Sequence, residues 1–320
     1  MALRIGFIGV GGMAETHLKH IADNPHAKVA AVCDVVEERA AAAAARYDAA
    51  AYTDFKAMLD KERPDAVFVC VPPFAHADIE ETAAARGIHL FVEKPVGLDV
   101  GQARRKAAAI AAAGLIASSG YALRYMDNIE RARAFLEGRT IGFVRAYYLS
   151  GFVETPWWRV KAKSGGQLVE QATHVADLMR YLAGEVSQVF ALMATRHLAD
   201  KPELDIADVT TVSVRFASGA IGHVDACCIQ PDHRIGLEIQ GRDFRVAYEG
   251  TTLTLVDGDS KITLPNGGGI FKEQDDTFIR AILENKPALI RSSYADALKS
   301  LEVTVAANES ADTGLPVRLA

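Results

Sequence analysis

A glycine-rich turn near the amino terminus constrains the fold of this chain more than any other feature. Gly9-Val10-Gly11 ends the apolar run 5–10 and precedes a helical pattern at 13–23. The first glycine allows a tight turn, the second lets the backbone approach a diphosphate, and the small Ala14 lets the helix pack on the strand. Free N–H groups at the start of such a helix favour negative charge. The turn predicts a dinucleotide-binding unit, whose cofactor-binding residues include Gly9, Val10, Gly11, Gly12 and Met13.

The first 120 or so residues alternate between short apolar runs and helical patterns. Apolar runs at 28–33, 66–71 and 89–92 are typical of strands that are buried on both faces of a sheet. The alanine-rich segment 37–46 is expected to be a helix, because alanine is the best helix former. Strands separated by helices form parallel sheets with both faces covered. We therefore predict an α/β domain with a doubly wound parallel sheet, a Rossmann fold, over residues 1–122.

The pattern changes after about Arg124, where apolar runs follow one another closely. Strands are predicted at 143–150, 209–216, 220–226, 236–240, 244–248, 252–256 and 261–264. Tight turns such as Ala217-Ser218-Gly219 separate some of these runs, which fits antiparallel hairpins. Helical patterns lie at 168–183, 274–284 and 293–309. Residues 123–320 are therefore predicted to form an α+β domain with a large, mostly antiparallel open sheet.

Composition and charge narrow the classes of partner and location. The chain has 320 residues, a formal net charge of -6 and no basic stripe, so neither nucleic acid nor an anionic membrane is expected as a partner. No apolar run approaches the length that crosses a membrane. The start, Met1-Ala2-Leu3-Arg4, lacks a leader pattern, and the four cysteines have no framework spacing. These features favour a reducing, cytoplasmic location.

Asp34 ends the second predicted strand, about twenty residues after Ala14. A carboxylate at this place accepts hydrogen bonds from ribose hydroxyls and repels a 2′-phosphate, because both groups are negatively charged. Val35 and Val36 offer no charge to neutralise that phosphate, although Arg39 lies one helical turn further on. NAD is therefore the predicted cofactor, and NADP stays open. The alternative for Asp34 is a helix cap with no ligand.

Glu93-Lys94-Pro95 closes the predicted strand 89–92. The carboxyl ends of parallel strands border the crevice in which such sheets bind ligands. Lys94 is therefore predicted to bring an amine beside the nicotinamide. The alternative is a solvated lysine before a proline turn.

A second polar cluster consists of Glu170, His174 and Asp177, which share one face of the predicted helix 168–183 because of their spacing. Histidine titrates near neutral pH, and a carboxylate one turn away would orient it and hold its charge, so the cluster favours acid–base catalysis. Two alternatives are a solvated helix face and a metal site. No other histidine or cysteine cluster completes a ligand shell, and no metal is expected.

Together these motifs resemble the Gfo/Idh/MocA family of oxidoreductases over nearly the whole chain. The resemblance also includes Trp158-Arg159, Gly165-Gly166 and the ending 310–317. It implies an NAD(P)-dependent dehydrogenase or reductase that transfers a hydride between nicotinamide and a hydroxyl or keto carbon of a sugar, cyclitol or related polyol. It further implies a homodimer or homotetramer formed through the sheet of the second domain.

The resemblance also implies roles for individual residues. Lys94 matches the lysine that contacts the substrate hydroxyl and the nicotinamide ribose, and His174 matches the histidine that transfers a proton. Glu170 stands where many members have aspartate, and its extra methylene changes which hydroxyl the carboxylate reaches. The residues expected near the cofactor also include Val71, Pro72, Pro73, His76 and Glu93. The positions expected on the substrate side include Tyr121, Arg124, Trp158 and Arg159. For Trp158, core or interface packing is an equal alternative.

Two other functions are alternatives to a dehydrogenase. Some relatives use NAD transiently to cleave a glycosidic bond or eliminate a group, and Lys94, Glu170 and His174 fit that reaction as well. A non-catalytic sensor would bind NAD without chemistry, but such a protein is expected to lack the lysine or the histidine. The spacing of the residues does not identify the substrate or the direction of the reaction.

Overall fold

The computed structural model describes residues 2–319, which form two compact units. The first unit runs up to Tyr125 and also contains Gly269–Leu298. The second unit contains Met126–Gly268 and the chain from Lys299 onward. No helix of the described residues is both long enough and apolar enough to span a membrane.

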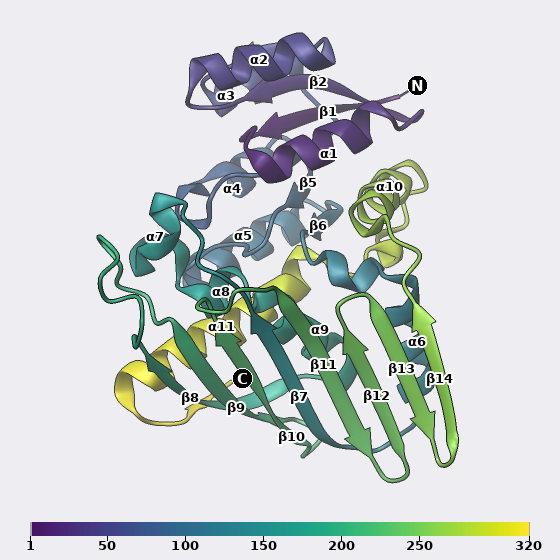
Figure 1. The fold of residues 1–320 in the computed structure, drawn as a ribbon. Coiled ribbons are helices and arrows are strands. Elements are labelled where there is room, and N and C mark those ends of the chain that lie inside the picture. Colours follow the sequence, from purple (N-terminus) through teal and green to yellow (C-terminus); the bar gives the residue numbers. More distant parts are fainter. Residues whose placement is uncertain (1, 320) are drawn as a thin grey trace. The chain divides into compact units, whose positions relative to one another are not determined.

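A six-stranded parallel sheet organises the first unit, in the order β3-β2-β1-β4-β5-β6 (Figure 1). The strands are β1 (Leu3–Ile8), β2 (Ala27–Cys33), β3 (Ala50–Tyr52), β4 (Ala66–Val69), β5 (His89–Val92) and β6 (Ala117–Ser119). Every pairing between neighbours is parallel, and the order reverses direction between β1 and β4. This topology confirms the predicted doubly wound Rossmann sheet. The short strands β3 and β6 were not among the predicted strands.

The helices that accompany this sheet include α1 (Gly12–Ala22), α2 (Glu37–Tyr47), α3 (Phe55–Glu62), α4 (Ile79–Ala84), α5 (Val100–Ala112) and α10 (Ile270–Leu283). Asp99 caps α5, since its carboxylate accepts a hydrogen bond of 2.6 Å from the N–H of Gln102. Pro73–Ala75 forms a separate 3-10 turn before α4 begins at Ile79.

Helix α10 returns to the first unit from the carboxyl-terminal half of the sequence. Phe278 is fully buried in the same core as Phe68 and Phe91, with ring centroids 5.6 and 5.8 Å away. Gln274 on the same helix donates a 2.8 Å hydrogen bond to the carbonyl of Ser119. The predicted domains, 1–122 and 123–320, are each one continuous segment, so they do not include the return of α10 to the first unit. Helical periodicity shows that a segment has an apolar face, but it does not show which core that face joins.

A nine-stranded sheet organises the second unit, in the order β14-β13-β12-β11-β7-β10-β9-β8-β15. The strands are β7 (Ile141–Leu149), β8 (Val186–Ala194), β9 (Val209–Phe216), β10 (Ile221–Cys227), β11 (Arg234–Gly241), β12 (Phe244–Glu249), β13 (Thr252–Asp257), β14 (Ser260–Pro265) and β15 (Val317–Arg318). All neighbours pair antiparallel except β7 and β10. The predicted large, mostly antiparallel open sheet is confirmed, and it also contains β8 and β15, which were not predicted.

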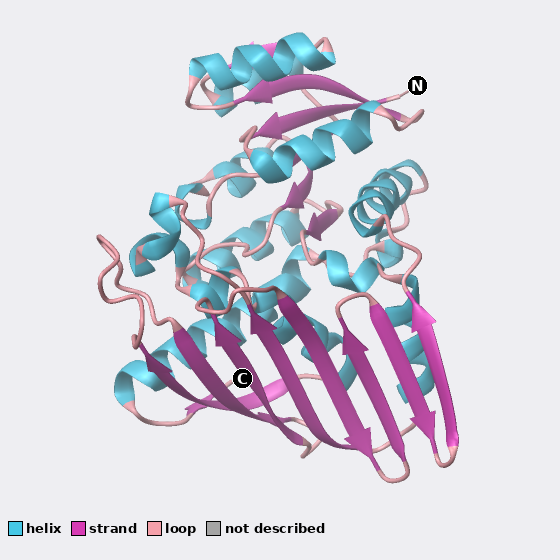
Figure 2. Ribbon diagram, viewed as in Figure 1, coloured by secondary structure: helices cyan, strands magenta, loops and turns pink. Residues whose placement is uncertain are grey.

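Helices of the second unit cover one face of this sheet, while the other face carries none of the helices described for that unit (Figure 2). The helices of the second unit are α6 (Asp127–Leu136), α7 (Lys161–Ser164), α8 (Gln167–Glu170), α9 (Thr173–Ala183) and most of α11 (Tyr294–Thr313). Burial alternates along β9 and β10, as expected for a sheet with one buried face. Leu192 and Ile221 on the uncovered face are 61% and 51% exposed.

Candidate active site

The glycine turn after β1 has the backbone geometry that a diphosphate site needs. Gly9 has φ 86°, and a Cβ at this position would lie 2.7 Å from the carbonyl oxygen of Cys70, so only glycine fits. Gly11 is the N-cap of α1 and has no side-chain cap. A Cβ added at Gly11 or Gly12 would meet nothing within 4 Å. The N–H groups at the start of α1 therefore lie beside open space, which fits the diphosphate of a dinucleotide.

Asp34 joins the glycine turn to the end of β2. Its carboxylate accepts hydrogen bonds from the N–H groups of Val10, at 3.1 Å, and Val36, at 2.9 Å. Each oxygen keeps a further lone pair for a ribose hydroxyl. The N-cap of α2 is Val36, so the structure does not favour the helix-cap alternative for Asp34. Val35 beside it is 89% exposed and adds no positive charge that would attract a 2′-phosphate.

The segment after β4 contains a buried histidine that pairs with a buried carboxylate. Val71 and Pro72 are half-buried, and Pro73 begins the 3-10 turn that leads to His76. The His76 ring pairs through Nδ1 with the Glu80 carboxylate, whose other oxygen lies 2.8 Å from Nζ of Lys106. Burial raises the pKa of Glu80, but its interactions with His76 and Lys106 outweigh burial and hold that pKa below its usual value. The cofactor role predicted for 71–76 stays a prediction.

Lys94 follows β5 at the carboxyl end of the sheet, as predicted. Its side chain is half-buried, which differs from the solvated lysine of the alternative interpretation. Its backbone N–H donates a 3.0 Å hydrogen bond to Oε2 of Glu93, and the Glu93 side chain is itself buried. Gly9, Asp34 and Lys94 thus follow β1, β2 and β5, whose carboxyl ends meet at one edge of the parallel sheet.

The helix predicted at 168–183 is broken in the structure into α8 and α9. Two N–H groups, those of Gln171 and Ala172, donate to the carbonyl of Gln167, and the second spans five residues instead of four. This wider turn shifts the phase of the helix. The predicted placement of Glu170 and His174 on one continuous helix face is therefore wrong, because the four-residue spacing crosses the break.

The side chains of Glu170 and Trp158 are joined by a hydrogen bond. The indole Nε1 of Trp158 donates a 2.9 Å hydrogen bond to Oε2 of Glu170. Trp158 is only 1% exposed and packs with Ile206 and Cys228, so its ring is part of a small core. Its role as a substrate-lining residue stays a prediction.

His174 and Asp177 lie on α9 in different surroundings. His174 is half-buried near the start of the helix, whereas Asp177 is fully buried. The Asp177 carboxylate accepts a 2.7 Å hydrogen bond from Oγ of Ser300 on α11. Asp177 therefore helps to join two helices, and the solvated-face alternative does not describe it.

The other predicted substrate residues are held by protein groups. Tyr121 is 1% exposed. The guanidinium of Arg124 pairs with Asp296 at 2.5 Å and donates to the carbonyl of Arg291 at 2.7 Å. Arg159 donates to the carbonyls of Glu154 and Pro202, at 3.0 and 3.3 Å. Their contacts with a substrate stay predictions.

Sequence reasoning missed one buried charged group in the first unit. His17 is fully buried on α1 and lies between the carboxylates of Glu93 and Asp275. The available signal was the position of His17 on the apolar face of the helix, beside Ala14, Leu18 and Ile21. The sequence did not reveal the partners of His17, because Asp275 stands 258 residues away.

A cavity of about 720 Å³ in the first unit lies away from these residues. It is lined by Leu3, Asp65 and His89 among others, which lie at the amino ends of β1, β4 and β5. Gly9 and Lys94 follow the carboxyl ends of strands in the same sheet. The cavity therefore lies at the opposite edge and is not the candidate site.

Comparisons with known proteins agree with this geometry. Residues 3–121 match the family model described as "Oxidoreductase family, NAD-binding Rossmann fold", and residues 129–247 match the "GFO/IDH/MocA C-terminal domain". The chain is 27% identical over 337 residues to myo-inositol 2-dehydrogenase of Thermotoga maritima, covering 99% of this chain and 98% of the relative. It is 30% identical over 261 residues to levoglucosan dehydrogenase of Pseudarthrobacter phenanthrenivorans, covering 70% and 67%.

A solved structure supports the same assignment. GenD2 from gentamicin A biosynthesis, in complex with NAD, superposes with a TM-score of 0.86 at 26% identity, covering 100% of this chain and 97% of that chain. The glycine turn offers backbone donors and Asp34 a carboxylate, as expected of an NAD site, and the contacts of these residues with NAD stay predictions. The chain therefore belongs to the Gfo/Idh/MocA family of oxidoreductases, and its first unit contains the NAD-binding Rossmann domain of that family.

Proposed function

We propose that this protein is an NAD-dependent dehydrogenase or reductase that acts on a hydroxyl or keto carbon of a sugar, cyclitol or related polyol. One observation carries the proposal: Lys94 follows β5 in the same sheet whose β1 and β2 lead into the glycine turn and Asp34. A primary amine is thereby held at the edge of the sheet where a dinucleotide binds. The names of the two dehydrogenase relatives, which act on inositol and levoglucosan, support the substrate class.

In this proposal each polar side chain has a separate task. Lys94 stabilises the negative charge that develops on the substrate oxygen, as a preorganised cation does in an oxyanion hole. His174 accepts the hydroxyl proton during oxidation and returns it during reduction. Bound NAD supplies the acceptor for the hydride.

Glu170 is proposed to bind a second hydroxyl of the substrate. Its Oε2 already accepts the indole N–H of Trp158, which holds the carboxylate in one orientation. A carboxylate oxygen can accept more than one hydrogen bond, so an acceptor that already has a protein donor can also bind a hydroxyl. A fixed acceptor of this kind discriminates between stereoisomers that differ at one carbon.

The Lys94→Ala variant tests the proposal. Loss of one preorganised donor costs about 100- to 1,000-fold in turnover, so we expect a loss of that size in kcat. The affinity for NAD, measured by fluorescence titration, should survive, because the glycine turn and Asp34 are intact. Lys19→Ala on the exposed face of α1 is the matched control and should leave kcat unchanged. Near-normal turnover of Lys94→Ala would contradict the proposal.

We also propose that the uncovered face of the nine-stranded sheet joins copies of this chain into a homodimer or homotetramer. The support is the pair of exposed apolar side chains on that face, Leu192 and Ile221, on an open sheet whose other face is covered. Light scattering of the Leu192→Glu/Ile221→Glu variant tests this, and an unchanged oligomer would contradict it.

A cytoplasmic location is the remaining part of the proposal. It is supported by Cys33, Cys70, Cys227 and Cys228, all of which are free thiols in the structure. Cell fractionation followed by thiol labelling of the purified protein tests it, and a disulfide in the isolated protein would contradict it.

A further inference from the structure

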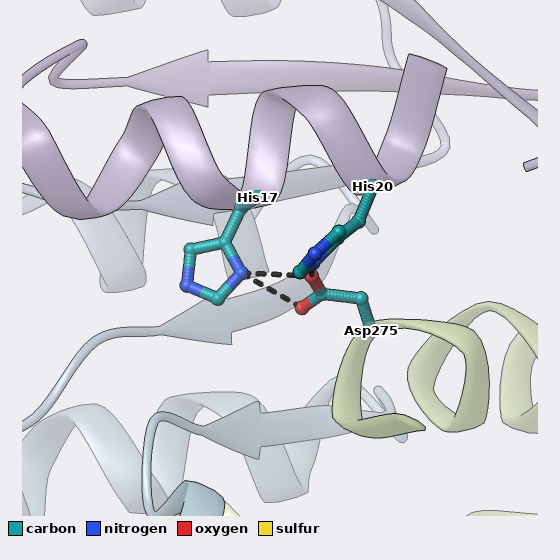
Figure 3. A group of neighbouring side chains, drawn as sticks. All are labelled: His17, His20 and Asp275. Atoms are coloured by element: carbon teal, nitrogen blue, oxygen red, sulfur yellow. Dashed lines mark hydrogen bonds and ion pairs between the residues drawn. The ribbon is translucent and has the colours of Figure 1, made fainter. Parts of the chain in front are cut away.

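Three segments far apart in the sequence meet at the buried side chain of His17. Its Nδ1 lies 2.8 and 2.9 Å from the two carboxylate oxygens of Asp275 on α10. Its Nε2 lies 3.0 Å from Oε1 of Glu93, directly after β5. Figure 3 shows His17 and His20 of α1 reaching toward Asp275. All these groups belong to the first unit.

The contacts of His17 require a charged ring. Both ring nitrogens face carboxylate oxygens, so both must carry a proton to donate. Burial lowers the pKa of His17, but the hydrogen bonds and negative charges of Asp275 and Glu93 outweigh burial and raise it to about 10. The rings of Phe68 and Phe91, with centroids 5.3 and 4.9 Å away, surround the charge with apolar groups. An imidazolium is thus held at neutral pH between two carboxylates.

His20 is a second histidine that contacts Asp275. Its Nδ1 lies 2.8 Å from Oδ2 of Asp275, and its side chain is 20% exposed. His20 has no hydrogen bond with Glu93 among the contacts recorded for the described residues. It therefore shares one partner with His17 but lacks the connection to β5.

Glu93 connects this charged group to Lys94. Its Oε2, the oxygen that faces away from His17, accepts the 3.0 Å hydrogen bond from the backbone N–H of Lys94. On its remaining side the carboxylate packs against Gly120, where an added Cβ would lie 2.6 Å from three of its atoms. The carboxylate is thus confined by His17, by the peptide of Lys94 and by a glycine that leaves no spare space.

We propose that His17 and Asp275 are positioning residues that fix the orientation of Lys94 through the carboxylate of Glu93. This inference rests on the proposed catalytic role of Lys94. Without the imidazolium, Glu93 would be a buried carboxylate with an unpaired oxygen, and it would take up a proton or move. Either change alters the acceptor that holds the Lys94 peptide. A displacement of about 1 Å at a reacting group lowers the rate by as much as about 100-fold.

The His17→Gln variant is the direct test, because the glutamine amide can still donate a hydrogen bond but carries no charge. We expect kcat to fall at least about tenfold while the dissociation constant of NAD stays within about twofold of the wild-type value. Asp275→Asn is a milder second variant, in case His17→Gln folds poorly, and it should change kcat in the same direction. His20→Ala is the matched control and should leave kcat nearly unchanged.

A double variant separates positioning from general stability. If His17 acts through Lys94, the His17→Gln change should have no further effect on kcat in the Lys94→Ala background. A purely structural role of His17 would lower kcat by the same factor in both backgrounds and would overturn the inference. Gly120→Ala displaces Glu93 from its other side without altering the histidine, and it should reproduce the loss of kcat.

The outcomes distinguish this inference from the proposed function. If Lys94→Ala is inactive and His17→Gln is fully active, the inference fails and the proposed function stands. If Lys94→Ala itself retains normal turnover, the proposed function fails. Nitrogens of His17 and His20 and an Asp275 oxygen also lie within 4.8 Å of one another, a spacing at which a metal ion can bind. Elemental analysis that finds one tightly bound metal ion, lost in His20→Ala, would overturn the assignment of His17 as an imidazolium.

Discussion

The two units hold their candidate residues in different ways. In the first unit Gly9, Asp34 and Lys94 follow the ends of parallel strands, so the sheet itself brings them to one edge. In the second unit Glu170 and His174 lie on two helices separated by a wide turn. A residue at the end of a strand has a fixed place in the sheet. The face on which a helical residue lies can be predicted from spacing only where the helix is continuous. Spacing in the sequence is therefore a better guide to the first group than to the second.

The partners of the two groups differ as well. In the first unit the buried His17 pairs with Asp275, which stands 258 residues away in the sequence. The second unit pairs Glu170 with Trp158, only 12 residues away. Buried ion pairs are costly to break from one side, because the partner keeps an unpaired charge. We expect substitutions in the first unit to have the larger effects.

The largest effect is expected at Gly9. Its left-handed backbone and the close carbonyl of Cys70 mean that Gly9→Ala should cost on the order of 3 kcal/mol in the free energy of unfolding. Gly11→Ala is the matched control, since its φ is -75° and a Cβ there meets nothing within 4 Å. It should fold normally and lose NAD affinity, because the methyl group would enter the diphosphate space. Urea unfolding and NAD titration of both variants measure this, and equal stability of the two would contradict the argument.

His17 should make stability depend on pH. Its pKa is raised from 6.5 to about 10 by Asp275 and Glu93, against the effect of burial. Its contribution to stability is therefore fully present below pH 6.5 and is lost as the pH rises toward 10. The difference in unfolding free energy between the wild type and His17→Gln should shrink over this interval, by at most about 1.4 kcal/mol per pH unit. A difference that is independent of pH would show that His17 is neutral in the folded protein.

Asp34 should determine affinity for the cofactor. Asp34→Asn removes the negative charge and one of the two backbone contacts, so we expect NAD to bind about tenfold more weakly. NADP should lose less affinity, because the repulsion of its 2′-phosphate is also removed. Calorimetric titration with both cofactors tests this against Asp48→Asn, an exposed control. Equal losses for NAD and NADP would show that charge does not govern the choice.

Trp158 should have the smallest effect. Trp158→Phe keeps an aromatic ring in the small core but removes the N–H donor to Glu170, which is worth about 1 kcal/mol. We expect a change of a few-fold in KM, with kcat less affected, because Glu170 is proposed to bind a hydroxyl that does not react. Steady-state kinetics on the preferred substrate would measure the changes in KM and kcat. Unchanged kinetics would mean that the indole contact serves packing alone.

The sequence predicted the fold class and most strands because periodicity and turns are local properties. The two-residue strand β15 and the three-residue strands β3 and β6 are too short to show a pattern. The break after Glu170 escaped prediction, because Gln171 and Ala172 are ordinary helix formers and the extra residue of the turn leaves no compositional mark.

The positions of Gly9, Asp34 and Lys94 at strand ends were predictable, because short sequence motifs mark them. The positioning of Glu93 was not, because it depends on α10 joining the core of the first unit. A histidine on an apolar helix face indicates only that a buried partner exists. The identity of that partner is a property of the tertiary structure.

The most direct test of the account is the formation of NADH by the purified wild-type protein, followed by absorbance across a panel of sugars and inositols, with NAD and then NADP. The account predicts that at least one polyol gives stoichiometric NADH and the corresponding keto product, and that Lys94→Ala slows NADH formation by about 100- to 1,000-fold. Product formed from a glycoside without net NADH would contradict the dehydrogenase assignment in favour of a redox-neutral cleavage. NAD binding with no turnover of any compound would contradict catalysis itself.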